Sequence, residues 1–285
     1  MNVTLDYGRT GLELDLKGIR AEVIRPSFLE GLADEETAFR EAVRSPIGGP
    51  PLRECVRKGE TIALVIPDTT RALPNERLLR WTFAELPEVA PEQFVIVSGT
   101  GSHRKNTPGE WITMVGREIF ETYRCVDHDG HDPDTLVDVG RSPYGYPVRM
   151  NRDFVEADRK ILYGFIEPHL MAGYSGGYKA IFPGVAGVES IMHYHNAENI
   201  GHPRSTWGVL EGNPTQEHVR AGGALVPVDF LVNVTLNSRR EITRYFCGDV
   251  EAAHAEGCVF CRETAMQACS EPYPVVVTTN SGYPL

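Results

Sequence analysis

Polar side chains that can bind ligands or transfer protons follow three apolar runs of this chain. The runs end at Ile66, Val97 and Phe165, and the polar segments PDTTR, SGTGSHR and IEPH follow them directly. Such runs are typical of parallel strands buried on both faces, and open α/β sheets bind ligands beyond the carboxyl ends of their strands. Histidine suits proton transfer near neutral pH. We therefore expect these side chains to meet in one site: Asp68, Arg71, His103, Arg104 and His169.

A short glycine-rich turn, Gly99-Thr100-Gly101, follows the second apolar run. It is not a full dinucleotide fingerprint, because Arg104 stands where G-x-G-x-x-G requires its third glycine. Its backbone amides could still approach a phosphate group with little steric obstruction. A tight turn between a strand and a helix explains the same residues equally well.

The segment EPHLMAGYSGGYKAIFPG, residues 167–184, is a stronger candidate for phosphate binding. Ser175, Gly176 and Gly177 can present a hydroxyl group and backbone amides, and Lys179 follows as a cation. The spacing lacks the G-x-x-x-x-G-K-[ST] pattern of nucleoside triphosphatases, which disfavours that class. A purely structural loop is the alternative.

Two histidines, His193 and His195, lie in the segment MHYHNAEN, which we predict to be helical. Residues two positions apart on a helix point to different faces, so only one of them can serve a single site. A neutral imidazole suits nickel, copper or zinc, but one histidine alone makes a poor metal site. The remaining ligands would have to come from a cofactor.

The elements that must position these residues follow an α/β pattern. Thr107-Pro108-Gly109-Glu110 has the N-cap, the proline and the glutamate of a helix start, and this helix should run towards Tyr123. The predicted class is α/β, with a mostly parallel sheet and flanking helices. The predicted strands are residues 3–5, 12–16, 21–24, 61–66, 94–97, 159–165, 230–236 and 275–279, and the other predicted helices are residues 34–44, 75–86, 188–200, 215–221 and 250–267.

Length, charge and apolar content exclude several classes of protein. The 285 residues carry a net charge of −11, from 39 acidic and 28 basic side chains, which argues against binding to nucleic acid. No stretch approaches the ~20 apolar residues of a membrane span, and the N-terminus lacks the pattern of a secretory signal. We expect a cytoplasmic protein whose anionic ligands bind in a locally basic pocket.

Taken together, the motifs resemble the lactate racemase family that uses a nickel-pincer cofactor. The matching segments are DTTR, GTGSHR, EPHLMAGYSGGYK, FPG, YHNA and TTNSGYPL, and their order and spacing run the length of the chain. The resemblance implies an N-terminal α/β domain. It also implies a pyridinium-3,5-bisthiocarboxylic acid mononucleotide that binds nickel through a ring carbon and two sulphurs.

The resemblance also implies a role for each matching residue. Lys179 would carry the cofactor covalently, and His195 would complete the coordination of nickel. Tyr178 stands where the family often has arginine, which leaves the lysine in place. The other implied roles are acid/base catalysis by His103 and His169, orientation of a histidine by Asp68, attraction of the substrate carboxylate by Arg71, and cofactor phosphate binding by Ser175, Gly176 and Gly177.

The implied reaction is racemisation or epimerisation of a 2-hydroxy acid, with lactate as the default substrate. A Cα hydrogen beside an ionised carboxylate is very weakly acidic, so proton-coupled hydride transfer to the cofactor avoids a costly carbanion. One histidine would remove the hydroxyl proton of each enantiomer. The implied partners are the proteins that synthesise and insert the cofactor.

The resemblance divides the chain into residues 1–270, the cofactor-binding and catalytic domain, and residues 271–285, the first strand or linker of a second α/β domain. Most of that second domain is absent, so we expect a fragment with little or no racemase activity of its own. Two alternatives stay open: a zinc-dependent hydrolase that uses His103, His169 and His195, and a catalytically incomplete cofactor-binding domain.

Overall fold

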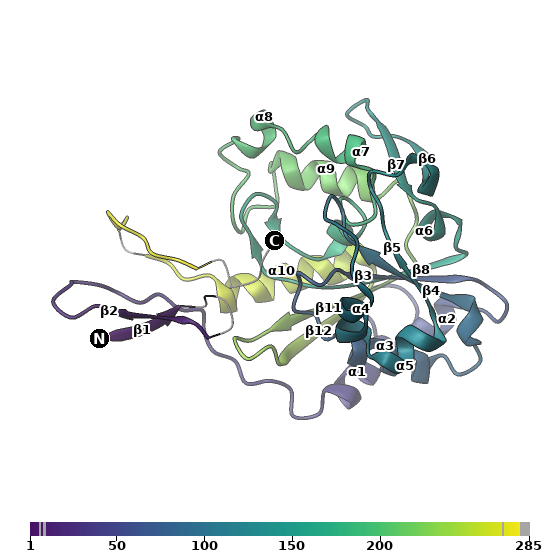
Figure 1. The fold of residues 1–285 in the computed structure, drawn as a ribbon, viewed down its shortest axis with the longest axis horizontal. Helices are drawn as coiled ribbons and strands as arrows, with labels where there is room; N and C mark the ends of the chain where they lie inside the picture. The colour runs from purple at the N-terminus through teal and green to yellow at the C-terminus, as the bar shows by residue number, and fades with distance from the viewer. Residues whose placement is uncertain (6, 8–9, 270, 280–285) are drawn as a thin grey trace.

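A six-stranded sheet forms the centre of the molecule, shown in Figure 1 as a computed structural model that describes residues 1–5, 7, 10–269 and 271–279. Its strands lie in the order β12-β11-β8-β3-β4-β5. β12 runs antiparallel to β11, and all other neighbours are parallel. The predicted α/β class with a mainly parallel sheet is therefore confirmed. The strands are β3 (Ile62–Pro67), β4 (Phe94–Gly99), β5 (Arg124–Asp127), β8 (Arg159–Phe165), β11 (Phe230–Leu236) and β12 (Ile242–Gly248).

The apolar runs form the central strands because helices cover both faces of the sheet. Ile62, Leu64 and Ile66 of β3 belong to one buried cluster, whereas Ala63 and Val65 belong to the other. Alternate residues of a strand point to opposite faces, so a strand covered on both sides is apolar at every position. The two clusters are the two halves of the hydrophobic core.

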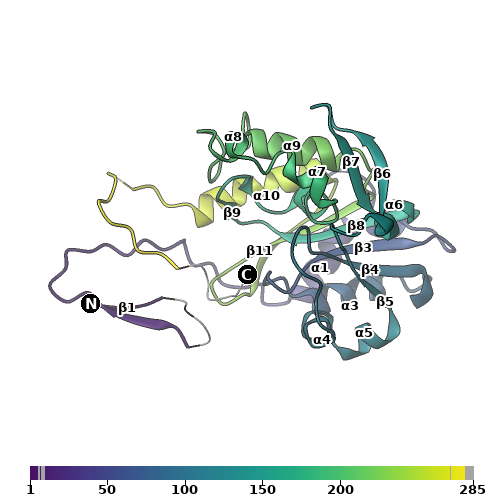
Figure 2. The same cartoon turned by 45° about the horizontal axis from the view of Figure 1, so that its top comes forward.

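The helices divide between the two faces, as Figure 2 also shows. One face carries α1 (Glu35–Arg44), α2 (Leu52–Cys55), α3 (Asn75–Glu85), α4 (Pro108–Val115) and α5 (Arg117–Thr122). The other carries α6 (Arg152–Glu156), α7 (Val188–Met192), α9 (Pro214–Gly223) and α10 (Val250–Ala265). The remaining elements are α8 (Ala197–Ile200), the 3₁₀ helices η1 (Pro91–Gln93), η2 (Pro133–Thr135) and η3 (Gly177–Ala180), and the strand pairs β1–β2 (Asn2–Leu5, Leu12–Asp15), β6–β7 (Leu136–Arg141, Pro147–Asn151) and β9–β10 (Pro168–His169, Gly173–Tyr174).

The helix start predicted at Thr107 is confirmed, but the helix is shorter than predicted. The Thr107 side chain accepts a hydrogen bond from the Glu110 amide, and the Glu110 side chain accepts one from the Thr107 amide. The helix stops at Gly116, which has φ +81°, and a second helix begins after it. This φ angle lies in the left-handed region, which disfavours residues with a Cβ atom, so the position favours glycine.

Removing the Thr107 hydroxyl should destabilise the fold. We expect Thr107→Ala to lower the free energy of unfolding by about 1 kcal/mol, because it leaves an N-terminal amide of α4 without its acceptor. Thr113→Ala is the matched control, since Thr113 is an exposed residue inside the same helix. Chemical denaturation checks both; equal unfolding midpoints for the two variants would contradict the capping role.

Two predicted elements differ in the structure. The predicted helix 188–200 breaks after Met192, and α8 begins only beyond Asn196, whose side chain caps it by accepting from the Asn199 amide. The predicted strand 275–279 is absent: three consecutive valines from Val275 are 77%, 74% and 64% exposed. A β-strand needs a pairing partner, and none lies beside this run among the described residues. Residues 21–24 also form no strand.

No helix in the described part of the chain is long and apolar enough to cross a membrane. The division of the chain at residue 270 stays a prediction, since that residue and residues 280–285 lie outside the described ranges.

Candidate functional site

A cavity of about 250 Å³ lies at the carboxyl ends of β3, β4 and β8. β3 comes first in the chain among the strands of this sheet. The later strands β4 and β5 lie on one side of it, and β8 and β11 lie on the other. Ligand crevices of open α/β sheets form at such a switch of direction. The predicted site residues that line the cavity are Asp68, Arg71, Gly99, Thr100, Gly101, His103, His169, Ser175, Gly176, Lys179 and His195.

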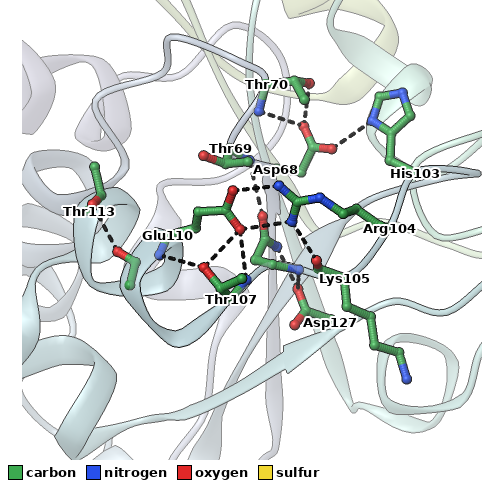
Figure 3. Close-up of polar contacts among 12 residues, drawn as sticks. Asp68, Thr69, Thr70, His103, Arg104, Lys105, Thr107, Glu110, Thr113 and Asp127 are labelled. Carbon is green, nitrogen blue, oxygen red and sulfur yellow. Dashed lines mark hydrogen bonds and ion pairs between the residues drawn. The ribbon is translucent and has the colours of Figure 1, made fainter. Parts of the chain in front are cut away.

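Asp68 and His103 form a hydrogen-bonded pair at the ends of β3 and β4. Asp68 is 4% exposed, and its Oδ2 lies 2.7 Å from His103 Nδ1 (Figure 3). Burial opposes ionisation of Asp68, but hydrogen bonds from His103 and Thr70 outweigh it and lower the pKa of the carboxyl group. The ionised carboxylate only accepts, so Nδ1 of His103 carries a proton, and in the neutral ring the lone pair lies on Nε2. His103 is thus prepared to accept a proton at Nε2.

Arg104 does not line the cavity, contrary to our expectation. Its guanidinium group donates to both carboxylate oxygens of Glu110, and Figure 3 shows it turned away from His103 towards α4. The paired charges explain the difference, because a bidentate carboxylate is a strong partner for arginine. Arg104 therefore anchors the turn that carries His103.

His169 reaches the cavity in a different state from His103. Its Nδ1 faces the backbone amides of Met171 and Ala172, at 3.4 and 3.2 Å, and accepts from both. The proton of the neutral ring therefore lies on Nε2. Burial, with the positive charges of Lys179 and Arg71, lowers the pKa of His169 to about 3. In this conformation His169 offers a hydrogen-bond donor, and acting as a base requires the other tautomer.

Lys179 lies on η3 and lines the cavity with its amine unpaired. Its Nζ has no hydrogen-bond or ion-pair partner within the described ranges, and burial, with the charge of Arg71, lowers its pKa to about 8. Arg71 likewise makes no ion pair with a carboxylate in the described part of the chain, although its charge opposes the rise that burial causes in the pKa of Glu167. The cavity is therefore locally basic in an acidic protein, as expected, and suits anionic ligands.

The lowered pKa of Lys179 predicts its reactivity. An amine is nucleophilic only when deprotonated, and the fraction of deprotonated amine rises as the pH passes through the pKa. We expect acetic anhydride to modify Lys179 half-maximally at about pH 8, whereas an ordinary lysine titrates near 10.5. Peptide mass spectrometry after brief labelling across a pH series measures this. A midpoint for Lys179 equal to that of exposed Lys58 would contradict the lowered pKa.

Several predicted phosphate-binding groups already have partners in the protein. The Gly101 amide donates to the Gly184 carbonyl, and the Thr100 hydroxyl donates to the His128 carbonyl. The Ser175 hydroxyl donates to the Phe165 carbonyl. Gly177 does not line the cavity, and its amide donates to Asn233. The Gly176 amide has no acceptor among the described residues and remains available at the cavity wall.

The two histidines of the YHNA region separate as predicted, but for a different reason. Neither is helical in the way we expected, since α7 ends at Met192. His193 is exposed and stacks on Tyr146 with a ring-centroid distance of 4.4 Å. His195 lines the cavity instead. A break between two short helices thus turns one histidine inward.

Sequence reasoning gave no role to several other residues of the cavity wall, among them Tyr163, Met171 and Pro183. Tyr163 lies within the buried run of β8, and its hydroxyl is hydrogen-bonded to Thr82 at 2.7 Å. Periodicity cannot separate such a residue from its apolar neighbours. Pro183 belongs to the FPG motif, so that motif was the available signal.

Residues 7–208 match the family model described as the lactate racemase N-terminal domain. The chain belongs to this family. Lactate racemase from Thermoanaerobacterium thermosaccharolyticum is 33% identical over 288 residues, covering 100% of this chain and 67% of that protein. Lactate racemase from Lactiplantibacillus plantarum is 33% identical over 255 residues, covering 89% and 60%.

Solved structures agree with this membership of the lactate racemase family. The lactate racemase apoprotein from Thermoanaerobacterium thermosaccharolyticum superposes with a TM-score of 0.81 and 32% identity, covering 93% of this chain and 63% of that one. A protein from Thermotoga maritima, with a TM-score of 0.68 and 20% identity, shares the fold. The chain thus spans about 60% to two thirds of the relatives it matches.

The cavity fits the cofactor that resemblance to the lactate racemase family implies. His195 Nε2 is buried without a hydrogen-bond partner, and burial lowers the pKa of this imidazole to about 4, which keeps it neutral. A neutral imidazole with an unused lone pair is a suitable nickel ligand. No three His, Cys, Asp or Glu side chains of the described residues gather as a metal site of their own. One protein ligand plus a metal-binding cofactor agrees with this arrangement.

Proposed function

We propose that this chain is the cofactor-binding and catalytic part of a cytoplasmic 2-hydroxy acid racemase or epimerase, with lactate as the default substrate. The observation that carries the proposal is the convergence of His103, His169, Lys179 and His195 on one cavity. These side chains come from three separate segments of the chain, since His169 and Lys179 share residues 167–184. If each of these side chains had only a structural role, nothing would require all four to line the same cavity.

Three groups of the cavity would hold the nickel-pincer nucleotide. Lys179 would form the covalent bond, because its pKa of about 8 leaves far more free amine at neutral pH than an ordinary lysine has. His195 would supply the protein ligand to nickel. The Gly176 amide and the backbone of the turn at residues 99–101 would lie near the phosphate. The proteins that synthesise and insert the cofactor are the implied partners.

The protein's own side chains would bind the substrate and transfer its hydroxyl proton. Arg71 would attract the substrate carboxylate, because its guanidinium group faces the cavity without a carboxylate partner among the described residues. His103 would take the hydroxyl proton at Nε2, while Asp68 stabilises the imidazolium that forms. The bound cofactor would supply the hydride acceptor that these side chains lack.

His169 would serve the opposite enantiomer as the second acid/base group. In the present tautomer its Nε2–H can donate a hydrogen bond to the hydroxyl or oxo oxygen of a substrate. To accept a proton, it must release the amides of Met171 and Ala172. The two amide contacts are long, at 3.4 and 3.2 Å, so they constitute a weak restraint.

The alternative of a zinc-dependent hydrolase needs three protein ligands around one ion. His103 and His195 each keep a ring nitrogen without a protein partner, but His169 accepts backbone amides at Nδ1, and no three His, Cys, Asp or Glu side chains of the described residues gather to hold one ion. This alternative also gives no role to Lys179. The geometry therefore favours the racemase.

A fusion tests the proposal. We would join this chain to the part of the Thermoanaerobacterium lactate racemase that it does not match, and express the fusion with the cofactor's biosynthetic enzymes. Chiral chromatography of L-lactate incubated with the product should show conversion to the racemate, with nickel bound. A folded fusion that binds zinc and leaves L-lactate unchanged would refute the proposal.

A further inference from the structure

Residues 175–179, which we call the glycine loop, carry Lys179 into the cavity. Gly176 and Gly177 have φ angles of +83° and +55°, so the chain reverses sharply just before η3. Such a turn is not rigid by itself, because glycine restricts the backbone least. Something else must fix the direction in which Lys179 leaves the loop.

Two buried polar side chains lie directly beneath the glycine loop. Asn233, in the middle of β11, is 0% exposed, and its Oδ1 accepts the Gly177 amide at 2.9 Å. His254, on α10, is 4% exposed, and its Nε2 donates to the Ser175 carbonyl at 2.9 Å. Neither side chain lines the cavity, so neither can touch a ligand there.

The packing around these contacts is tight. A Cβ atom at Gly176 would lie 2.5 Å from Asn233 Oδ1, and one at Gly177 would lie 2.7 Å from the His254 ring. Gly164, the register partner of Asn233 on β8, leaves room on the other side: a Cβ there would lie 3.1 Å from Asn233 Nδ2. The glycine loop thus packs directly on the side chains of Asn233 and His254, with no space for a larger residue at Gly176 or Gly177.

A polar residue at these positions is costly unless it serves a purpose. Asn233 interrupts the apolar run FLVNVTL, and burying an amide without hydrogen bonds is unfavourable. Burial lowers the pKa of His254 to about 4, which keeps the ring neutral and Nε2 protonated as a donor to the carbonyl. An apolar side chain would fill either position at less cost if packing were its only role.

We propose that Asn233 and His254 are positioning residues that hold the glycine loop in the conformation from which Lys179 reacts with the cofactor. The reaction of Lys179 with the cofactor rests on the proposed function. The support of the glycine loop by Asn233 and His254 does not depend on it. Both contacts are to the backbone, so they fix the peptide planes on either side of Gly176. They act on Lys179 through the loop.

Paired variants separate the hydrogen bonds from packing. His254→Gln keeps an amide nitrogen near the position of Nε2, whereas His254→Asn is one methylene too short to reach the Ser175 carbonyl. Asn233→Leu removes the acceptor oxygen at similar volume. Thr235→Val is the control, because Thr235 lies on β11 like Asn233, and the substitution deletes a part-buried hydrogen bond to Thr243 on β12 rather than one to the glycine loop.

Two measurements are made on each variant of the 285-residue chain, expressed with the cofactor's biosynthetic enzymes. Amide hydrogen exchange of the peptide over residues 175–180 should be about tenfold faster in His254→Asn and Asn233→Leu than in the parent chain, from the loss of one buried hydrogen bond. The amount of adduct on Lys179 should fall in the same two variants. Exchange and adduct should stay near the parental level in His254→Gln and Thr235→Val.

Parental exchange and parental adduct in His254→Asn and Asn233→Leu would overturn the inference. Equal losses in His254→Asn and His254→Gln would also overturn it, because packing rather than hydrogen bonding would then be responsible. If the parent chain itself carries no adduct, the proposed function fails, and loop exchange still decides whether Asn233 and His254 support the loop.

Discussion

Replacing Lys179 with arginine is expected to abolish covalent attachment of the cofactor while leaving the fold and the positive charge of the cavity in place. A guanidinium group stays protonated at all accessible pH values and is not a nucleophile, whereas the Lys179 amine is partly free near pH 8. Intact mass of Lys179→Arg, after expression with the biosynthetic enzymes, should show the bare chain. Bound nickel should fall to background.

Lys160→Arg is the matched control for this prediction. Lys160 is 7% exposed, and burial also lowers the pKa of its amine, but it donates to the Ala157 carbonyl outside the cavity. This variant should retain both adduct and nickel. An adduct of unchanged mass on Lys179→Arg would place the attachment elsewhere and contradict the proposed role of Lys179.

Replacing Asp68 with asparagine is expected to slow racemisation by about 10²- to 10⁴-fold, the usual contribution of a general base. The substitution removes the carboxylate that holds the proton on His103 Nδ1 and that stabilises the imidazolium. The rate is measured in the fusion with the segment of the Thermoanaerobacterium lactate racemase. Cofactor loading should stay at the parental level, since Asp68 contacts neither Lys179 nor His195 in the described structure.

Asp158→Asn is the control for the Asp68 prediction. Asp158 accepts hydrogen bonds from Thr61 at the opposite end of the sheet, so its loss removes an aspartate without touching the cavity. This variant should racemise lactate at the parental rate. If the Asp68→Asn fusion also racemises lactate at the parental rate, His103 needs no carboxylate partner. That result would contradict the proposed role of the Asp68–His103 pair as the general base.

The sequence predicted the location of the site better than its internal contacts. The apolar runs before Asp68, His103 and His169 indicated three parallel strands, and strand ends of one sheet must share an edge. That constraint is sufficient to bring the three side chains together. The state of each histidine was not predictable, because it depends on the residue opposite: a carboxylate at His103 and backbone amides at His169.

Local signals also failed where tertiary contacts override them. The spacing of residues 188–200 favours one helix, yet Asn196 starts a second one and turns His195 towards the cavity. Asn233 and His254 lie within an apolar strand and a helix, where nothing in the pattern shows that they face the glycine loop. The apolar run 275–279 satisfies the pattern of a strand but lacks a neighbour to pair with in the described structure.

The peptide that contains Lys179 provides the most direct test of the proposed site. The unsubstituted chain is expressed with the cofactor's biosynthetic enzymes, digested, and analysed by mass spectrometry alongside total metal content. The predicted result is a cofactor-sized adduct on Lys179 with one nickel ion for each modified chain. An unmodified Lys179 peptide together with stoichiometric zinc would contradict the proposal and favour the hydrolase.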